Sequence, residues 1–273
     1  MAHDVQAEQA VGMARFGDRV AEAVERKRSQ LVVGLDPRPD LLPVELRGDA
    51  HLGREQAAQA CARFCCGLVD AVAPYVVAVK PQLAFFEALG ADGVRAFEDV
   101  CAYARSAELL VIADGKRGDV SSTARAYASA YLEGEEGRPP LADALTVNPY
   151  LGRDTVEPFL AACRRDGGGI FCVLKTSNAG SAEIQDLVLS DGRPLWHEVA
   201  RLVREWGEDL VGEHGLTSVG AVVGATHPAE LDALDRASES WKERGDGDVR
   251  LGGERGAVHV RQLGGPPRHR PHR

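Results

Sequence analysis

The sequence predicts an α/β fold of the (β/α)8 TIM-barrel type, because short apolar runs alternate with longer segments of helical periodicity. Most of these runs are continuously apolar, which is typical of parallel strands covered on both faces. The first run ends in "GLDPRPDLLP", which lacks the G-x-G-x-x-G turn of a doubly wound sheet. A barrel instead places polar residues at many strand ends, as this chain does with Asp36, Lys80, Asp114, Asn148, Lys175 and Thr176.

Six strands and five helices are predicted, and each helical segment is long enough for a crossover connection. The predicted strands are 31–36, 76–81, 109–114, 144–149, 170–176 and 219–225. The predicted helices are 53–72, 91–107, 120–133, 153–166 and 194–210. A barrel needs eight strands, so the last one or two are in doubt, and "GAVHVRQL" (256–263) is the remaining candidate.

A change of composition divides the chain into one barrel domain, 1–240, and an atypical basic tail, 241–273. The tail carries eight Lys or Arg and four Asp or Glu, whereas the whole chain has a net charge of -9. Its end, "GGPPRHRPHR", is typical of a poorly ordered segment. We interpret this break as a frameshift, a misjoined reading frame or degeneration of the barrel's last part.

The overall charge and the termini exclude several classes of protein. A net charge of -9 argues against a general binder of nucleic acid or of anionic membranes. The first 30 residues contain no continuous apolar segment of a secretory signal, and no run reaches the ~18 residues of a membrane span. The six cysteines form no C-x-x-C pair and no zinc spacing. We therefore expect a cytoplasmic protein with reduced core thiols and no metal.

The stretch "LLVIADGKRGDVSST" (109–123) ends a predicted buried strand in a cluster of charges. Asp114 and Lys116 share a face of that strand, and Lys80 is expected at the same level on the neighbouring strand. Charges gathered on one dry site must satisfy each other or a ligand. An alternating Lys–Asp array can stabilise a carbanion and then protonate it. The alternative is a set of charges that simply meets water at the strand ends.

The cluster "DGKRGD" resembles the D-x-K-x-x-D signature of the orotidine 5'-phosphate decarboxylase family. The segments "LVVGLDPRPDLLP", "VVAVKPQLAFFE", "TVNPYLGRD", "LKTSNAGSAEIQDL" and "SVGAVVGAT" also follow that family's order. Together they resemble its longer bacterial branch over residues 16–235 or so. The resemblance implies decarboxylation of orotidine 5'-phosphate to UMP in pyrimidine biosynthesis, without a metal or an organic cofactor.

The resemblance also implies roles for four catalytic residues. Lys80, Asp114, Lys116 and Asp119 would form the family's Lys-Asp-Lys-Asp array. Lys116 would stabilise the carbanion at pyrimidine C6 and protonate it, while Asp114 would lie beside the departing carboxylate. The loop carrying Asp119 and Thr123 would reach into the neighbouring subunit's site, which implies a homodimer with shared active sites.

Further residues are candidates for substrate binding. By resemblance, Asp36 would accept hydrogen bonds from the ribose and Ser177 would bond to the pyrimidine. Asn148 either lines the site or serves only an Asn-Pro turn. The family's seventh strand and its glycine-rich phosphate loop are not evident here, and Arg261 is the candidate for the arginine that grips the phosphate.

Two other functions stay open. A magnesium-dependent sugar-phosphate decarboxylase or aldolase of the same barrel suprafamily also uses D-x-K-x-x-D, but "VKPQLAFFE" and "KTSNAGS" favour the nucleotide enzyme. The other alternative is an inactive product with a damaged C-terminus, at best a dimerising scaffold.

Four residues that follow Lys80 are expected to pack at the start of a helix and to have no role in the site: Gln82, Phe85, Phe86 and Glu87.

Overall fold

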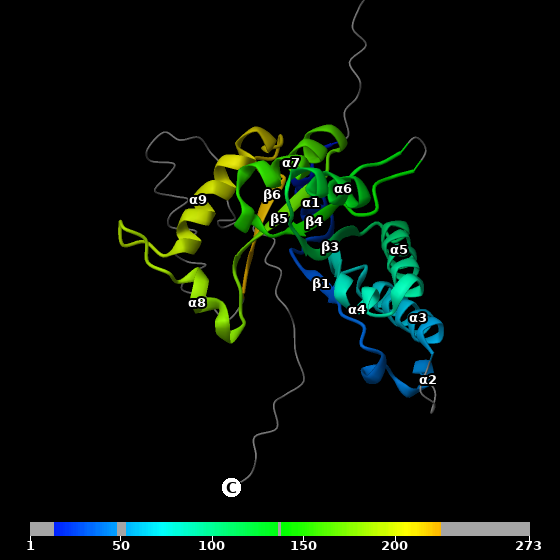
Figure 1. Cartoon of the computed structure of the whole chain (residues 1–273). Helices are drawn as coiled ribbons and strands as arrows, with labels where there is room; N and C mark the ends of the chain where they lie inside the picture. The colour runs from blue at the N-terminus through cyan, green and yellow to red at the C-terminus, as the bar shows by residue number, and fades with distance from the viewer. Residues whose placement is uncertain (1–13, 48–52, 136–137, 225–273) are drawn as a thin grey trace, which may run out of the picture.

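Six parallel strands form one sheet in the order in which they occur in the chain (Figure 1). The computed structural model describes residues 14–47, 53–135 and 138–224. The strands are β1 (Val32–Leu35), β2 (Ala78–Pro81), β3 (Leu110–Arg117), β4 (Ala144–Val147), β5 (Gly169–Lys175) and β6 (Val219–Val223). All six predicted strands are confirmed, and their sequential parallel order is that of a (β/α)8 barrel. The candidate strand 256–263 and the proposed tail 241–273 lie outside the described residues.

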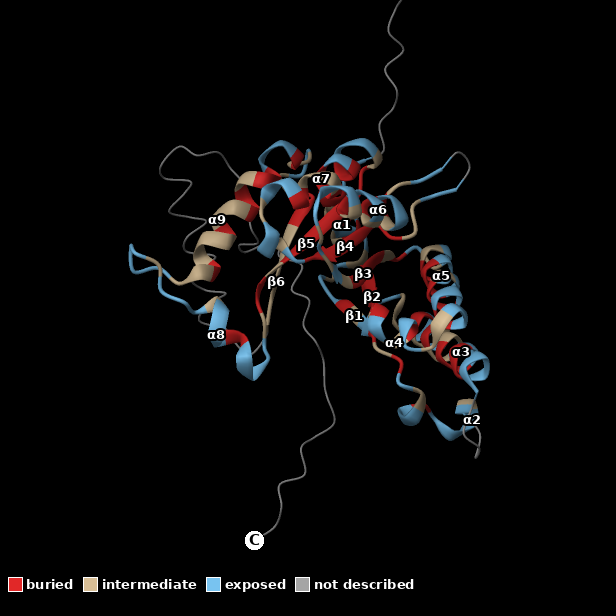
Figure 2. Cartoon of the chain, viewed as in Figure 1, coloured by how far each residue is buried: buried red, intermediate tan, exposed pale blue. Residues whose placement is uncertain are grey.

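The longer helices that connect consecutive strands lie on the outer face of the sheet (Figures 1 and 2). The longer helices are α1 (Phe16–Lys27), α3 (Arg54–Val72), α5 (Gly90–Ser106), α6 (Ser121–Leu132), α7 (Arg153–Asp166) and α9 (Leu195–Gly207). The short ones are α2 (Val44–Arg47), α4 (Leu83–Glu87) and α8 (Ala182–Gln185), with 3-10 turns η1 (Pro39–Leu41), η2 (Pro149–Leu151), η3 (Ala179–Ser181) and η4 (Glu208–Leu210). The five predicted helices are confirmed as α3, α5, α6, α7 and α9. No helix of the described part could span a membrane.

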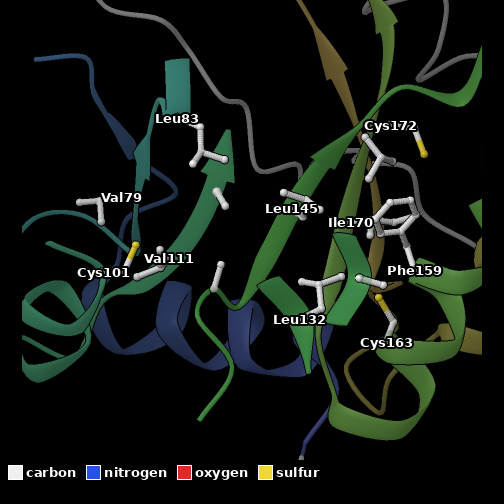
Figure 3. Packing of buried hydrophobic residues seen from close by; sticks show 14 of the residues in the cluster. Val79, Leu83, Cys101, Val111, Leu132, Leu145, Phe159, Cys163, Ile170 and Cys172 are labelled. Atoms are coloured by element: carbon white, nitrogen blue, oxygen red, sulfur yellow. The ribbon is translucent and has the colours of Figure 1, made fainter. Parts of the chain in front are cut away.

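The larger hydrophobic core lies between the strands and these outer helices (Figure 3). Val111 of β3 lies beside Cys101 of α5, and both side chains are fully buried. Ile170 of β5 lies against Phe159 and Cys163 of α7. Each large aliphatic or aromatic side chain buried in this way contributes about 1.5–3 kcal/mol, so this layer fixes the sheet on which the polar residues stand.

A second, smaller core lies on the other face of the sheet, where α1 runs across the amino ends of the strands (Figure 3). Phe16 of α1 meets Phe171 of β5 edge to face, with ring centroids 5.8 Å apart. A Cβ atom on Gly169 would lie 2.4 Å from the Phe16 ring, so only glycine fits beneath it. Apolar residues thus fill the amino end of this inner face, and polar residues follow toward the carboxyl end.

Asp143, buried just before β4, ties several elements together at the amino end of the sheet. Its Oδ1 accepts a hydrogen bond from Nη1 of Arg19 on α1 at 2.6 Å, and its Oδ2 accepts one from the backbone N–H of Val111 at 2.8 Å. Arg105 of α5 contributes a second ion pair at 3.5 Å. Arg19 also donates to the carbonyl oxygen of Gly167 at 3.0 Å. The cluster fixes α1 and α5 against β3 and β4.

The six cysteines are all unpaired, and five of them are buried. Burial raises the pKa of the Cys61 thiol to about 11 and that of Cys163 to about 12. The pKa values of the other four thiols are raised as well, first by burial. The predicted core thiols are therefore confirmed, and they stay protonated at neutral pH.

Candidate active site

The D-x-K motif stands on an irregular part of β3, where the ladder to β4 shifts register. Ala113 pairs with Leu145 and Arg117 with Val147, so β3 advances four residues while β4 advances two. Lys116 lies in this bulge with a φ of 45°. A non-glycine residue in the left-handed region is uncommon and strained, and such strain concentrates at functional sites. The bulge turns the Lys116 side chain out of the regular strand pattern.

Asp114 is the centre of the site, because four side chains donate hydrogen bonds to its carboxylate. Nζ of Lys80 bonds to Oδ2, and Nζ of Lys116 bonds to Oδ1 at 2.6 Å. Nε2 of Gln82 reaches Oδ2 at 3.1 Å, and the hydroxyl of Thr146 donates to Oδ1 at 2.9 Å. The donors come from β2, β3 and β4 and from the residue that precedes α4. Three neighbouring strands thus converge on one carboxylate.

The strand register differs from the expected one in a single respect. Gln82, and not Lys80, lies directly opposite Asp114 in the parallel ladder. The pairing of Val79 with Val111 places Lys80 two positions earlier, on the same face as Asp114. The expectation that Lys80 lies at the same level as Asp114 was therefore wrong. The four-carbon side chain of lysine spans the offset, and the predicted contact still forms.

The electrostatic state of the site follows from its burial. Asp114 is 4% exposed, and this burial alone would raise its pKa. The positive charge of Lys80 and hydrogen bonds from Lys116 and Lys80 outweigh burial and hold the pKa of Asp114 below its ordinary value. Lys80 is buried as well, whereas the side chain of Lys116 is 44% exposed. The carboxylate of Asp114 is therefore held in place, and the ammonium group of Lys116 beside it is accessible.

Three other predicted residues lie apart from this cluster. Oδ1 of Asp36, beyond the end of β1, is buried without a hydrogen-bond partner among the described residues. Oδ1 of Asp119 accepts a hydrogen bond from the backbone N–H of Val120 at 2.7 Å. Thr123 is half-buried in the first turn of α6. The structure thus groups Lys80, Asp114 and Lys116, and no described contact joins Asp119 to them.

The last three predicted residues have different settings. Ser177 is exposed just after β5, in a segment held by Lys175, whose Nζ bonds to Asp186 at 2.5 Å. Oδ1 of Asn148 accepts a hydrogen bond from the backbone N–H of Tyr150 at 3.1 Å, so the expected Asn-Pro turn is present. Arg261 lies outside the described residues. The roles of these residues in binding substrate stay predictions.

The sequence did not reveal two polar residues of the site. Thr146 lies in the run "ALTVNP", where it looked like an ordinary strand residue. Gln82 was expected to pack, and the structure corrects this because its side chain bonds to Asp114. Glu87 is also not a packing residue, since it forms an ion pair with Arg117. Phe86 is buried against Phe97 as expected, with ring centroids 5.5 Å apart.

The donor set around Asp114 is unlike a metal centre. Both of its carboxylate oxygens face ammonium groups, which would repel a cation. Within residues 14–47, 53–135 and 138–224, no three His, Cys, Asp or Glu side chains gather as they would around a metal ion. The cluster can stabilise negative charge next to Lys116 and can supply a proton from its Nζ.

The fold and the site together define an enzyme of the barrel class, with a Lys–Asp–Lys cluster at the carboxyl ends of its strands. Residues 29–252 match the model of the orotidine 5'-phosphate decarboxylase / HUMPS family, and the chain belongs to this family. An orotidine 5'-phosphate decarboxylase of Rhodopirellula baltica is 47% identical over 228 residues, which are 82% of this chain and 75% of that protein. One of Deinococcus radiodurans is 44% identical over 216 residues, which are 79% and 71% of the two chains.

Solved structures agree with this membership. The structure of the Leishmania donovani OMP decarboxylase superimposes with a TM-score of 0.64 at 33% sequence identity. The match covers 81% of this chain and 75% of that one. The resemblance identified from the strand-end motifs is therefore confirmed at the level of the family.

Proposed function

We propose that this protein decarboxylates orotidine 5'-phosphate to UMP in pyrimidine biosynthesis, as a carboxy-lyase. The observation that carries the proposal is the bonding of Lys80 and Lys116 to the two oxygens of one buried carboxylate, Asp114. The family membership of the chain supplies the substrate. The geometry supplies the chemistry, because such a cluster can stabilise a carbanion and protonate it.

The reaction needs one bond to break and one to form. The bond between pyrimidine C6 and the carboxylate carbon breaks, and its electron pair stays on C6 while carbon dioxide leaves. Asp114 would lie beside the departing carboxylate, and the charge of Lys116 would stabilise the electron pair. Nζ of Lys116 then gives its proton to C6. No metal or organic cofactor takes part in these steps.

The other predicted residues would hold the substrate. Oδ1 of Asp36, which is buried and has no hydrogen-bond partner within the part of the chain that the structure describes, is suited to accept a hydrogen bond from a ribose hydroxyl, because a lone buried acceptor is costly without a donor. Ser177, and less directly Asn148, would contact the pyrimidine side of the site. Arg261 would bind the phosphate, since a guanidinium matches a phosphate dianion.

We also propose a homodimer with shared active sites. Asp119 makes its described hydrogen bond within its own loop, which leaves its second carboxylate oxygen available to a partner's site. Large apolar side chains are exposed on the loops that follow β3 and β4: Val120, Tyr150 and Leu151. A second copy would cover them. Since its substrate is a phosphorylated, charged molecule that does not cross membranes freely, the enzyme would work in the cytoplasm.

A spectrophotometric assay with the purified full-length chain tests the function. We expect the absorbance of orotidine 5'-phosphate to decline as UMP forms, and we expect the rate to be unchanged by EDTA. A rate that EDTA abolishes would instead support the magnesium-dependent alternative. Folded protein without any turnover would support the inactive product with a damaged C-terminus.

A further inference from the structure

Thr146 of β4 connects the two members of the D-x-K motif through a single hydroxyl group. Its Oγ1 accepts a hydrogen bond from the backbone N–H of Lys116 at 2.9 Å and donates one to Oδ1 of Asp114 at 2.9 Å. The directions are fixed by chemistry, because an amide N–H can only donate and an ionised carboxylate can only accept. Thr146 is 2% exposed, so water does not compete for these bonds.

The bond to Lys116 comes at the point where the sheet cannot supply one. The register shift between Ala113 and Arg117 interrupts the ladder between β3 and β4, so Lys116 has no regular ladder partner on β4. Lys116 also has a φ of 45°, a left-handed conformation that is strained for a non-glycine residue. A strained residue keeps such a conformation only where its surroundings hold it. The Thr146 hydroxyl replaces the missing ladder bond.

We propose that Thr146 is a positioning residue, which holds the backbone of Lys116 and the carboxylate of Asp114 in one fixed relation. The inference rests on the proposed decarboxylation for its kinetic consequence. Both described bonds of the Thr146 hydroxyl go to the two motif residues. Thr146 would therefore affect the reaction through Lys116 and Asp114. Without the hydroxyl, the backbone at Lys116 would relax from its left-handed conformation, and its Nζ would leave the line to the reacting carbon.

The kinetic test compares two substitutions at Thr146 with a matched control. Thr146→Val keeps the shape and removes the hydroxyl, and Thr146→Ser keeps the hydroxyl. We expect kcat of Thr146→Val to fall about 100-fold, the scale of a small misplacement of a reacting group. KM should stay within about threefold, because ground-state contacts are untouched. Thr146→Ser should retain most of the wild-type kcat.

The control is Thr155→Val, at a second buried threonine, in α7, whose hydroxyl bonds only to the carbonyl oxygen of Gly152 at 2.7 Å among the described residues. This variant should lose a comparable amount of stability and keep its turnover. If Thr155→Val loses as much activity as Thr146→Val, the effect is general destabilisation and the proposal is wrong. Wild-type kcat in Thr146→Val would also overturn it. Thr146→Ala replaces the valine variant if that variant does not fold.

A second readout does not depend on activity. The Lys116 amide of the full-length protein should exchange its hydrogen slowly in the wild type and in Thr146→Ser, and quickly in Thr146→Val. Equal exchange rates in all three proteins would refute the bridging role. If the wild type exchanges as expected and yet does not decarboxylate orotidine 5'-phosphate, the proposed function fails while the bridge stands.

Discussion

Two buried aspartates stand at opposite ends of the same sheet, and each is held by two cations. Asp143, at the amino end, is paired with Arg19 and Arg105. Asp114, at the carboxyl end, is paired with Lys80 and Lys116. The arginines come from helices that the pairs fix in place, whereas the lysines come from strands that are already fixed by the sheet.

The same arrangement, one aspartate between two cations, serves a structural purpose in one cluster and a chemical purpose in the other. A guanidinium is charged at every accessible pH and holds a carboxylate in a rigid fork, so it suits a structural joint. An ammonium is a compact charge that can give up a proton. The two clusters also differ in exposure to solvent. The side chain of Lys116 is 44% exposed, whereas those of Arg19 and Arg105 are each 22% exposed. The amino end therefore stabilises the fold, and the carboxyl end is available for chemistry.

The largest expected effect is at the carboxyl end. Lys116→Ala should lower kcat/KM by more than about 1,000-fold, because it removes both the proton donor and a charge that stabilises the carbanion. The free energy of unfolding should change little, since Lys80 still pairs with Asp114. The absorbance assay and a denaturation curve measure the two quantities. Arg95→Ala, on the exposed face of α5, is the matched control and should behave as wild type. Retained turnover in Lys116→Ala would refute its role as proton donor.

The opposite outcome is expected at the amino end. Asp143→Ala should lower the free energy of unfolding by about 3 kcal/mol, because Arg19, Arg105 and the N–H of Val111 all lose their contact with the carboxylate. Turnover per folded molecule should stay the same. Urea denaturation followed by circular dichroism measures the loss. Asp143→Asn, which keeps an acceptor for the N–H of Val111, should lose less. If Asp143→Ala instead lost turnover while remaining as stable as wild type, the contrast between the two ends would collapse.

The smallest effect is expected at a third carboxylate, Asp18 of α1. Its Oδ1 accepts a hydrogen bond from the backbone N–H of His214 at 2.9 Å and lies 3.1 Å from Nδ1 of that histidine. The hydrogen bond and charge of Asp18 raise the pKa of His214 above its ordinary value. A raised histidine pKa stabilises the fold while the ring is protonated. The contribution is therefore present below about pH 6.5 and is lost as the pH rises through the higher folded-state pKa.

His214→Gln provides the comparison for this third pair, because it removes the titrating ring and keeps the backbone N–H. The wild type should be more stable than the variant at about pH 5.5, and this advantage should shrink by about pH 9. Chemical denaturation at a series of pH values measures the difference. A difference that does not vary with pH would show that the ring makes no charged contact with Asp18.

Much of the fold could be predicted because the strands are continuous apolar runs and the longer helices have clear periodicity. The spacing of Asp114 and Lys116 predicted that their side chains meet, and they do, although Lys116 reaches Asp114 from a bulge and not from a regular strand. The register between β2 and β3 could not be predicted. Nothing in "VVAVKPQ" indicates that Gln82, and not Lys80, pairs with Asp114 in the ladder. Thr146 was missed for a related reason. Its role depends on a bulge between two strands that are separated by a helix in the chain.

Other roles could not be predicted, because the local sequence gives little indication of them or because they depend on groups outside the described residues. Asp143 stands in "ADALTV", where it resembles the polar end of a loop, and only the packing of α1 and α5 reveals its partners. The contributions of Asp119, Ser177 and Arg261 to the site stay predictions, because they depend on a partner, on a substrate or on residues outside the described part.

Because the native thiols are buried, they should react little with reagents that label cysteine. Five of the six cysteines are shielded, and every one has a raised pKa, so alkylating reagents meet little thiolate at neutral pH. A cysteine introduced by Val188→Cys, at a position that is 73% exposed, would react far faster than the native ones. A fluorophore attached there would report on the segment between α8 and α9 without any native cysteine having to be removed.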